Sequence, residues 1–172
     1  MRSFLFGLIL GLILIPLLAF LYFQFGYAPV ATAASPFPFE KRFAKLALNA
    51  RIQREAPKES PVPASPENLI AGAKVYRDYC AVCHGSRGAG PTPVARGMYP
   101  PPPQLFKGKG VTDDPAGETW WKVQNGIRLT GMPAFGLSLS STEVWQVSQM
   151  LANADKLPPE ATALVSAEPP AK

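Results

Sequence analysis

The sequence predicts an all-α protein, with one membrane-spanning helix near the N-terminus followed by a helical domain that has long loops. The first observation is an uncharged run of twenty residues, 4–23. At about 1.5 Å per residue this run spans roughly 30 Å, the thickness of a bilayer's hydrocarbon core. The second observation is a set of three helix start signals after residue 64, each followed by apolar residues at helical spacing. The third is that no segment shows the apolar–polar alternation typical of strands.

Composition excludes several classes of protein. The chain has 172 residues, including 20 prolines, two cysteines and one histidine. Two cysteines exclude a disulfide-rich scaffold, and three Cys/His side chains fall short of the four ligands of a structural zinc site. Most of the net charge of +5 comes from residues 1–66, with seven Lys/Arg against three Asp/Glu, whereas residues 67–172 hold ten against nine. This near-neutral second part argues against nucleic-acid binding.

Four segments follow from these patterns. Arg2 precedes the apolar run and Tyr22 and Tyr27 lie at its far end, where amphipathic rings favour the membrane interface. The positive N-terminal flank predicts a cytoplasmic N-terminus and an exported remainder. A cleaved signal peptide is the alternative, because residues 31–33 (Ala-Thr-Ala) offer a cleavage site, but signal peptides have shorter apolar regions, about 7–15 residues. We therefore divide the chain into a membrane anchor (1–27), an amphipathic stretch with a Pro-rich stalk (28–66), a globular domain (67–157) and a Pro/Ala-rich C-terminal tail (158–172).

The stretch 37–54 combines apolar residues at helical spacing with five basic residues. Such a helix lies on anionic headgroups or against a partner subunit, or it is a solvated stalk, and the sequence leaves these alternatives open. Four prolines between residues 57 and 66 then predict an extended polyproline-II tether.

The globular domain is predicted to contain three helices. The first begins at Ser65, with Pro66 in its first turn and an apolar face that reaches Tyr76 and Cys80. The second runs from Asp114, as N-cap, to Asn125, with Gly126 as its C-terminal cap. The third starts with a capping box, Ser140 and Glu143, and its apolar set is Val144, Val147, Met150 and Leu151. Residues 85–110 are rich in Gly and Pro and are predicted to form a long loop, so another group must fill the middle of so small a core.

The sequence Cys80-Ala81-Val82-Cys83-His84 identifies that group. The spacing C-x-x-C-H is that of covalent haem attachment, in which each thiol adds to one vinyl group and the next residue offers an imidazole to the iron. A bare C-x-x-C also occurs in redox pairs and half zinc sites, but this chain has no second cysteine pair and no other histidine. The alternative is a local disulfide between Cys80 and Cys83 with His84 uninvolved. We predict one haem c, attached through Cys80 and Cys83, with His84 as an iron ligand.

The second axial ligand is predicted to be a methionine, because there is no second histidine. Met1 lies across the membrane, and Met150 falls on an apolar helix face, where methionine is usually core filler. Met98 lies only fourteen residues beyond the histidine, a short tether to the opposite haem face. Met132 lies in a Gly-Met-Pro sequence, where Gly permits close backbone approach and Pro fixes the chain direction. We therefore predict Met132 as the ligand, with Met98 as the alternative.

With these motifs, the segment from Glu67 to about Leu157 resembles a class I cytochrome c of the membrane-anchored bacterial type. Gly72-x-x-x-Tyr76, just before the first haem cysteine, matches the family's first helix, and residues 125–135 (NGIRLTGMPAF) are similar to its axial-methionine loop. The resemblance implies three to four short helices and long loops wrapped around one covalent haem. It implies that Gly72 lets the terminal helix cross closely, against Val147 and Met150. It also suggests that the carbonyl of Pro91 accepts the Nδ1 proton of His84.

Three more side chains are candidates for contacts with the haem propionates. The indole N–H of Trp120 or Trp121 would donate to a propionate, with ordinary core packing as the alternative. Arg128 would neutralise a propionate, with a surface position as the alternative. The run of prolines 100–103 stiffens a loop along the haem edge or docks a partner.

The predicted function is one-electron transfer by a membrane-tethered cytochrome on the periplasmic side of the inner membrane. His/Met ligation leaves no open position for a small-molecule substrate at the iron, and methionine raises the reduction potential. The expected partners are the membrane itself and redox proteins of a respiratory or photosynthetic chain, such as a quinol-oxidising complex, a terminal oxidase or a dehydrogenase. One alternative is a fixed subunit of such a complex. A haem enzyme is the other, and it would require Met132 to leave the iron.

Overall fold

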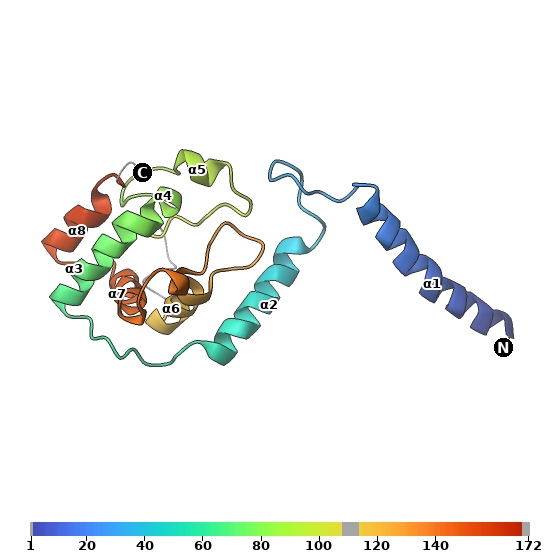
Figure 1. The fold of residues 1–172 in the computed structure, drawn as a ribbon, viewed down its shortest axis with the longest axis horizontal. Coiled ribbons are helices and arrows are strands. Elements are labelled where there is room, and N and C mark those ends of the chain that lie inside the picture. Colours follow the sequence, from blue (N-terminus) through green and yellow to red (C-terminus); the bar gives the residue numbers. More distant parts are fainter. Residues whose placement is uncertain (1, 108–113, 170–172) are drawn as a thin grey trace. The chain divides into compact units, whose positions relative to one another are not determined.

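The computed structural model describes residues 2–107 and 114–169, and every regular element within these ranges is a helix (Figure 1). The all-α prediction is therefore confirmed. The chain divides into two compact units, Met1–Phe43 and Ala44–Lys172, which are described separately. In chain order, the elements are α1 (Arg2–Gln24), α2 (Glu40–Glu55), α3 (Pro66–Val75), the π-helical turn η1 (Tyr76–Cys80), α4 (Ala81–His84), α5 (Pro93–Arg96), α6 (Ala116–Asn125), the 3₁₀ turn η2 (Phe135–Leu137), α7 (Ser141–Ala152) and α8 (Pro159–Ser166).

The first unit consists mainly of α1. Among the described residues, α1 alone is long and apolar enough to cross a bilayer, with a mean hydropathy of 2.9 over its most apolar window. None of its residues is buried, and it runs through Pro16. Near its end, Tyr22 stacks on Tyr27 with ring centroids 6.1 Å apart. By length and composition, α1 is therefore the helix that the predicted anchor requires.

The second unit has its core between α3 and α7. Both α6 and α8 complete this core, since α6 packs on α7 and α8 packs on α3 (Figure 1). The most deeply buried large side chains are Tyr76, Met150, Val144, Val147 and Val165. All four apolar residues predicted for the third helix are buried, so that prediction is confirmed.

Gly72 sets how closely α3 and α7 approach. A Cβ placed on Gly72 would overlap the backbone carbonyl of Gln146 and lie 2.8 Å from the Cβ of Met150. The backbones therefore touch at this position, as the resemblance implied, with Gln146 and Met150 as the contacts.

Gly72→Ala is expected to destabilise the domain by about 1–3 kcal/mol, because the new methyl group meets rigid backbone and not a flexible side chain. Thermal unfolding of the detergent-solubilised chain, followed by circular dichroism, measures this effect. Gly90→Ala is the matched control, since a Cβ on Gly90 would have no heavy atom within 4 Å. Equal melting temperatures for the two variants would contradict the close crossing.

The helix termini follow the sequence signals closely, with one exception. Ser65 caps α3 through the backbone N–H of Asn68, and Ser140 and Glu143 form the predicted capping box of α7. In α6, however, the N-cap position is Pro115, and Asp114 instead pairs with Lys122, with 3.3 Å between Oδ2 and Nζ. The carboxylate of Asp114 pairs with an ammonium group about two turns along the chain, and both side chains line the cavity described below.

The predicted tether is part of the second unit and packs on its helices. The carbonyl of Pro57 lies so close to Gly117 that a Cβ there would overlap it. Further along, Val62 accepts a hydrogen bond of 3.0 Å from the side chain of Gln149 on α7. Ile52, at the end of α2, is only 2% exposed. The prolines therefore form a strap (residues 56–63) held on α6 and α7, because α6 has a glycine where the strap crosses it.

The predicted Pro/Ala-rich tail also contains core structure. Helix α8 begins with Pro159 in its first turn, a common start signal, and buries Ala161 and Val165 against α3. The backbone N–H of Arg87 donates to the carbonyl of Val165 at 2.8 Å. Residues 159–166 thus support the loop that follows His84. The prediction of a C-terminal tail from residue 158 onward did not include this helix.

Candidate functional site

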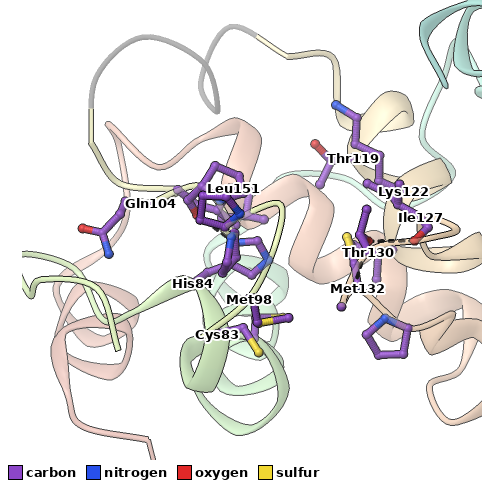
Figure 2. A pocket seen from close by; sticks show the side chains of 18 of the residues that line it. Cys83, His84, Met98, Gln104, Thr119, Lys122, Ile127, Thr130, Met132 and Leu151 are labelled. Atoms are coloured by element: carbon purple, nitrogen blue, oxygen red, sulfur yellow. Dashed lines mark hydrogen bonds between the residues drawn. The ribbon is translucent and has the colours of Figure 1, made fainter. Parts of the chain in front are cut away.

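The second unit contains a cavity of about 380 Å³, which is within the ~300–1,000 Å³ range of ligand pockets. Its wall is mostly apolar and comes mainly from the segment of η1 and α4, the loop 98–107, helix α6 and the loop before η2, with Leu151 of α7. Figure 2 shows the side chains that line it. Four of the predicted haem residues are among them, namely Cys80, Cys83, His84 and Met132.

The two cysteines and the histidine reach the cavity from one continuous helical segment. The α3 helix runs into the π-helical turn η1, which ends at Cys80, and α4 then ends at His84. Cys80 is 9% exposed and Cys83 is half-buried. Burial, with a smaller effect of Cys83, raises the pKa of the Cys80 thiol to about 12, so this thiol is neutral at physiological pH. The segment thus presents two thiols and an imidazole to a single apolar cavity.

The imidazole of His84 is oriented by a backbone carbonyl. Its Nδ1–H donates to the carbonyl of Pro103 at 2.8 Å. Burial lowers the pKa of His84, an effect that this hydrogen bond partly opposes, so the ring is neutral and its Nε2 keeps a free lone pair. The prediction that Pro91 is the acceptor is therefore wrong, since its carbonyl accepts instead from the Arg96 side chain at 2.9 Å. Pro91 lies close to His84 in sequence, but the rigid run 100–103 brings the more distant proline to the ring.

Tyr76 fixes the turn that follows His84. Its hydroxyl group donates a 2.6 Å hydrogen bond to the carbonyl of Gly85, and the side chain is fully buried. Burial, with a smaller effect of Cys80, raises the pKa of Tyr76, so the phenol remains a donor at neutral pH. Gly85 has a φ of +79°, a conformation that favours glycine. The aromatic residue that the family resemblance placed in the first helix thus holds the end of α4.

Met132 reaches the cavity from a hydrogen-bonded loop. Ile127 N–H donates to the carbonyl of Met132 at 3.1 Å, and Met132 N–H donates to the hydroxyl of Thr130, also at 3.1 Å. At the base of the loop, Gly126 has a φ of +65°, and a Cβ there would lie 2.9 Å from the carbonyl oxygen of Met132. Figure 2 shows Met132 on the side of the cavity away from His84. An imidazole and a thioether thus line the same cavity from different elements.

Met98 also lines this cavity. The short tether, which argued against it as an axial ligand, does not keep its side chain out of the site. A Cβ on Gly131 would overlap the terminal methyl group of Met98 and lie 3.4 Å from its sulfur. Met150, in contrast, is fully buried in the core, as predicted.

The three candidates for propionate contacts lie outside the cavity lining. Trp121 donates its indole N–H to the carboxylate of Glu55, at the end of α2, at 3.3 Å. This N–H is therefore already bonded and is not directed to a propionate. Arg128 is exposed. Trp120 stacks on Trp145, with centroids 5.3 Å apart, and its buried Nε1 has no hydrogen-bond partner in the part of the chain that the structure describes. Trp120 is therefore the candidate that still needs an acceptor.

Several polar residues of the site were not singled out from the sequence. Gln104, Thr119 and Lys122 line the cavity, and Lys122 pairs with Asp114. Thr119 and Lys122 are three residues apart on α6 and hence on one face of it, next to Val123. That spacing was available in the sequence, whereas Gln104 follows an irregular proline run whose path only the structure gives.

A family model described as cytochrome C oxidase, cbb3-type, subunit III matches residues 67–150 of this chain. Residues 67–150 form a cytochrome c domain. The matched segment contains both cysteines, His84 and the Met132 loop, so the cavity belongs to this domain.

Two curated relatives of this cytochrome c domain are larger proteins. The chain is 31% identical over 115 residues to the quinohemoprotein alcohol dehydrogenase ADH-IIG of Pseudomonas putida, a match that covers 62% of this chain and 14% of that protein. It is 32% identical over 89 residues to the quinohemoprotein alcohol dehydrogenase ADH IIB of the same organism, covering 51% of this chain and 11% of that protein. The chain therefore spans only about a seventh or less of each relative.

The cytochrome c family implies a haem c, and the residues of the cavity fit this group. Two thiols stand three residues apart beside an imidazole whose Nδ1 is already bonded, and a thioether lies on another wall. The remaining lining is mainly apolar, as a porphyrin face requires. The unpartnered indole N–H of Trp120 is a further donor for an anionic group near α6.

Proposed function

We propose that this protein is a membrane-tethered one-electron carrier with a single haem c. Cys80 and Cys83 would attach the haem, and His84 and Met132 would hold the iron. When bound, a haem c supplies one-electron exchange between ferrous and ferric iron. The observation that carries the proposal is the convergence of both thiols, the imidazole and the Met132 thioether on one apolar cavity within the cytochrome c domain.

The chain's own residues account for the type of chemistry. The Pro103 carbonyl orients His84, and the hydrogen-bonded loop from Ile127 to Met132 presents a thioether, a weak donor that favours the reduced state. With His84 and Met132 both holding the iron, no position on it would remain for a small-molecule substrate. The proposal is therefore a carrier of electrons, or the electron-transfer part of a larger enzyme.

The position of the protein follows from α1. We propose that α1 anchors the chain in the inner membrane with Arg2 on the cytoplasmic side, which places the haem domain in the periplasm. Trp120 remains our proposed donor to a propionate. Confinement to the membrane surface raises the effective concentration of the domain near integral-membrane partners, such as a quinol-oxidising complex, a terminal oxidase or a dehydrogenase.

A fixed subunit of a larger oxidase or dehydrogenase complex is the second candidate. On helix α2, Ile52 is buried within the second unit, whereas Leu46 is 67% exposed. The curated relatives carry their matching segments within alcohol dehydrogenases, which agrees with this candidate.

A two-dimensional gel separates the two candidates. Native membranes are solubilised in mild detergent, resolved in a native first dimension, and then denatured and stained for haem in the second. A haem-positive spot at the size of the 18.5 kDa chain is expected, with its anchor uncleaved. Descent from a small native band would show a tethered carrier, and descent from a large band would show a complex subunit whose co-migrating chains are the partners. The absence of any haem-positive spot would refute both.

A further inference from the structure

Two methionine side chains line the cavity, those of Met98 and Met132. The proposed function gives a role to Met132 but none to Met98. It lies against Gly131, the residue directly before Met132. Met98 is half-buried, and Gly131 is exposed at the rim of the cavity. The contact involves the outer part of the side chain, because a Cβ on Gly131 would overlap the Met98 methyl group and lie 3.8 Å from its Cγ.

Met98 is connected to the cysteine segment as well as to the methionine loop. Its N–H donates to the carbonyl of Ala95, at the end of α5, at 3.3 Å. The N-cap of α5, Thr92, donates its hydroxyl to the carbonyl of Val82, between the two cysteines, at 2.7 Å. The chain from Thr92 to Met98 is therefore a short bridge from the attachment segment to the loop of Met132.

The Met132 loop is exposed on its outer side at Gly131. Its hydrogen bonds join Ile127, Thr130 and Met132 to one another, and its base rests on Gly126. These interactions hold the loop together internally but leave Gly131 exposed at its tip. Among the described residues, the three heavy atoms nearest to a Cβ on Gly131 would all belong to Met98.

We propose that Met98 is a positioning residue for Met132: by packing on Gly131, it keeps the loop closed and the Met132 thioether directed into the cavity. This inference rests on the proposed function, since it assumes that Met132 ligates the iron. Methionine suits the role because its unbranched, polarizable side chain fits an irregular gap. Glycine at 131 suits it because any side chain there would take the space of the Met98 methyl group.

The test is the rate at which imidazole replaces Met132 on the ferric, detergent-solubilised chain, together with the methionine-to-iron charge-transfer band. In Met98→Ala the band is expected to persist, while imidazole binding accelerates by about three- to thirtyfold, which is within the range for loss of a coupled contact. Met98→Leu restores the volume without the sulfur and is expected to behave nearly as the natural chain. Gly131→Ala would displace the Met98 methyl group, so as a single substitution it is expected to accelerate imidazole binding. Added to Met98→Ala, it is expected to cause no further acceleration.

Each result has a distinct meaning. Unchanged imidazole kinetics in both Met98→Ala and Gly131→Ala would overturn the inference. Loss of the band in Met98→Leu would overturn it as well, because it would make Met98 the ligand. Additive effects of Met98→Ala and Gly131→Ala would also overturn it, because they would show that the two residues act separately. A natural chain without covalent haem or without the band would instead refute the proposed function.

Discussion

Met132→Ala is expected to abolish the methionine-to-iron charge-transfer band of the ferric protein completely, while the haem stays covalently attached. The thioether is the donor from which that band arises, and alanine offers no replacement. The cysteines and His84 lie on a separate segment, so attachment is unaffected. We also expect a lower reduction potential and immediate binding of azide, since the sixth position opens. Absorption spectra of the oxidised chain, with and without azide, measure the band and the azide binding, and a redox titration measures the potential.

Met150→Leu is the matched control for this experiment. Met150 is fully buried in the core between α3 and α7, and a volume-conserving change there costs less than about 1.5 kcal/mol. Its band is expected to be retained. A band that survives in Met132→Ala and disappears in Met98→Ala would show that Met98 holds the iron.

The double variant Cys80→Ala, Cys83→Ala is expected to lose all haem on denaturation. Both thiols line the cavity, so each is placed to form one thioether, and without them only the axial ligands hold the group. Axial bonds break when the chain unfolds, whereas thioethers survive. Haem staining of a denaturing gel measures the difference from the natural chain.

His84→Ala is the comparison that isolates the covalent link, because it removes an iron ligand and keeps both thiols. Whatever haem this variant incorporates is expected to remain with the chain on denaturation. Haem retained by the double cysteine variant under the same conditions would contradict the thioether assignment.

Much of the fold could be predicted because its signals are local. Ser65 and Ser140 cap helices through their own side chains, and the burial of Val144 and Val147 follows from helical periodicity alone. The strap was not predictable in this way. Prolines at 57–66 favour an extended chain, but whether such a chain packs depends on the distant Gly117, which only the folded structure brings to Pro57.

The site likewise has features that the sequence predicts and features that only the folded structure shows. The spacing of Cys80, Cys83 and His84 on one helical segment is a local pattern, and the structure brings these residues together with Met132. The acceptor for His84 was misassigned to Pro91, because sequence distance does not show how a rigid run of prolines crosses the ring. The contact of Met98 with Gly131 joins residues more than thirty positions apart, and no local signal marks it.

The most direct test of the account is the intact mass of the purified chain under denaturing, non-reducing conditions. We predict the mass of the 172-residue chain plus one haem, because Cys80 and Cys83 line a single cavity and would form two thioethers with one haem there. That result would establish one covalent haem and an uncleaved anchor together. The mass of the bare chain, or of the chain less two hydrogens from a disulfide between Cys80 and Cys83, would contradict the central claim.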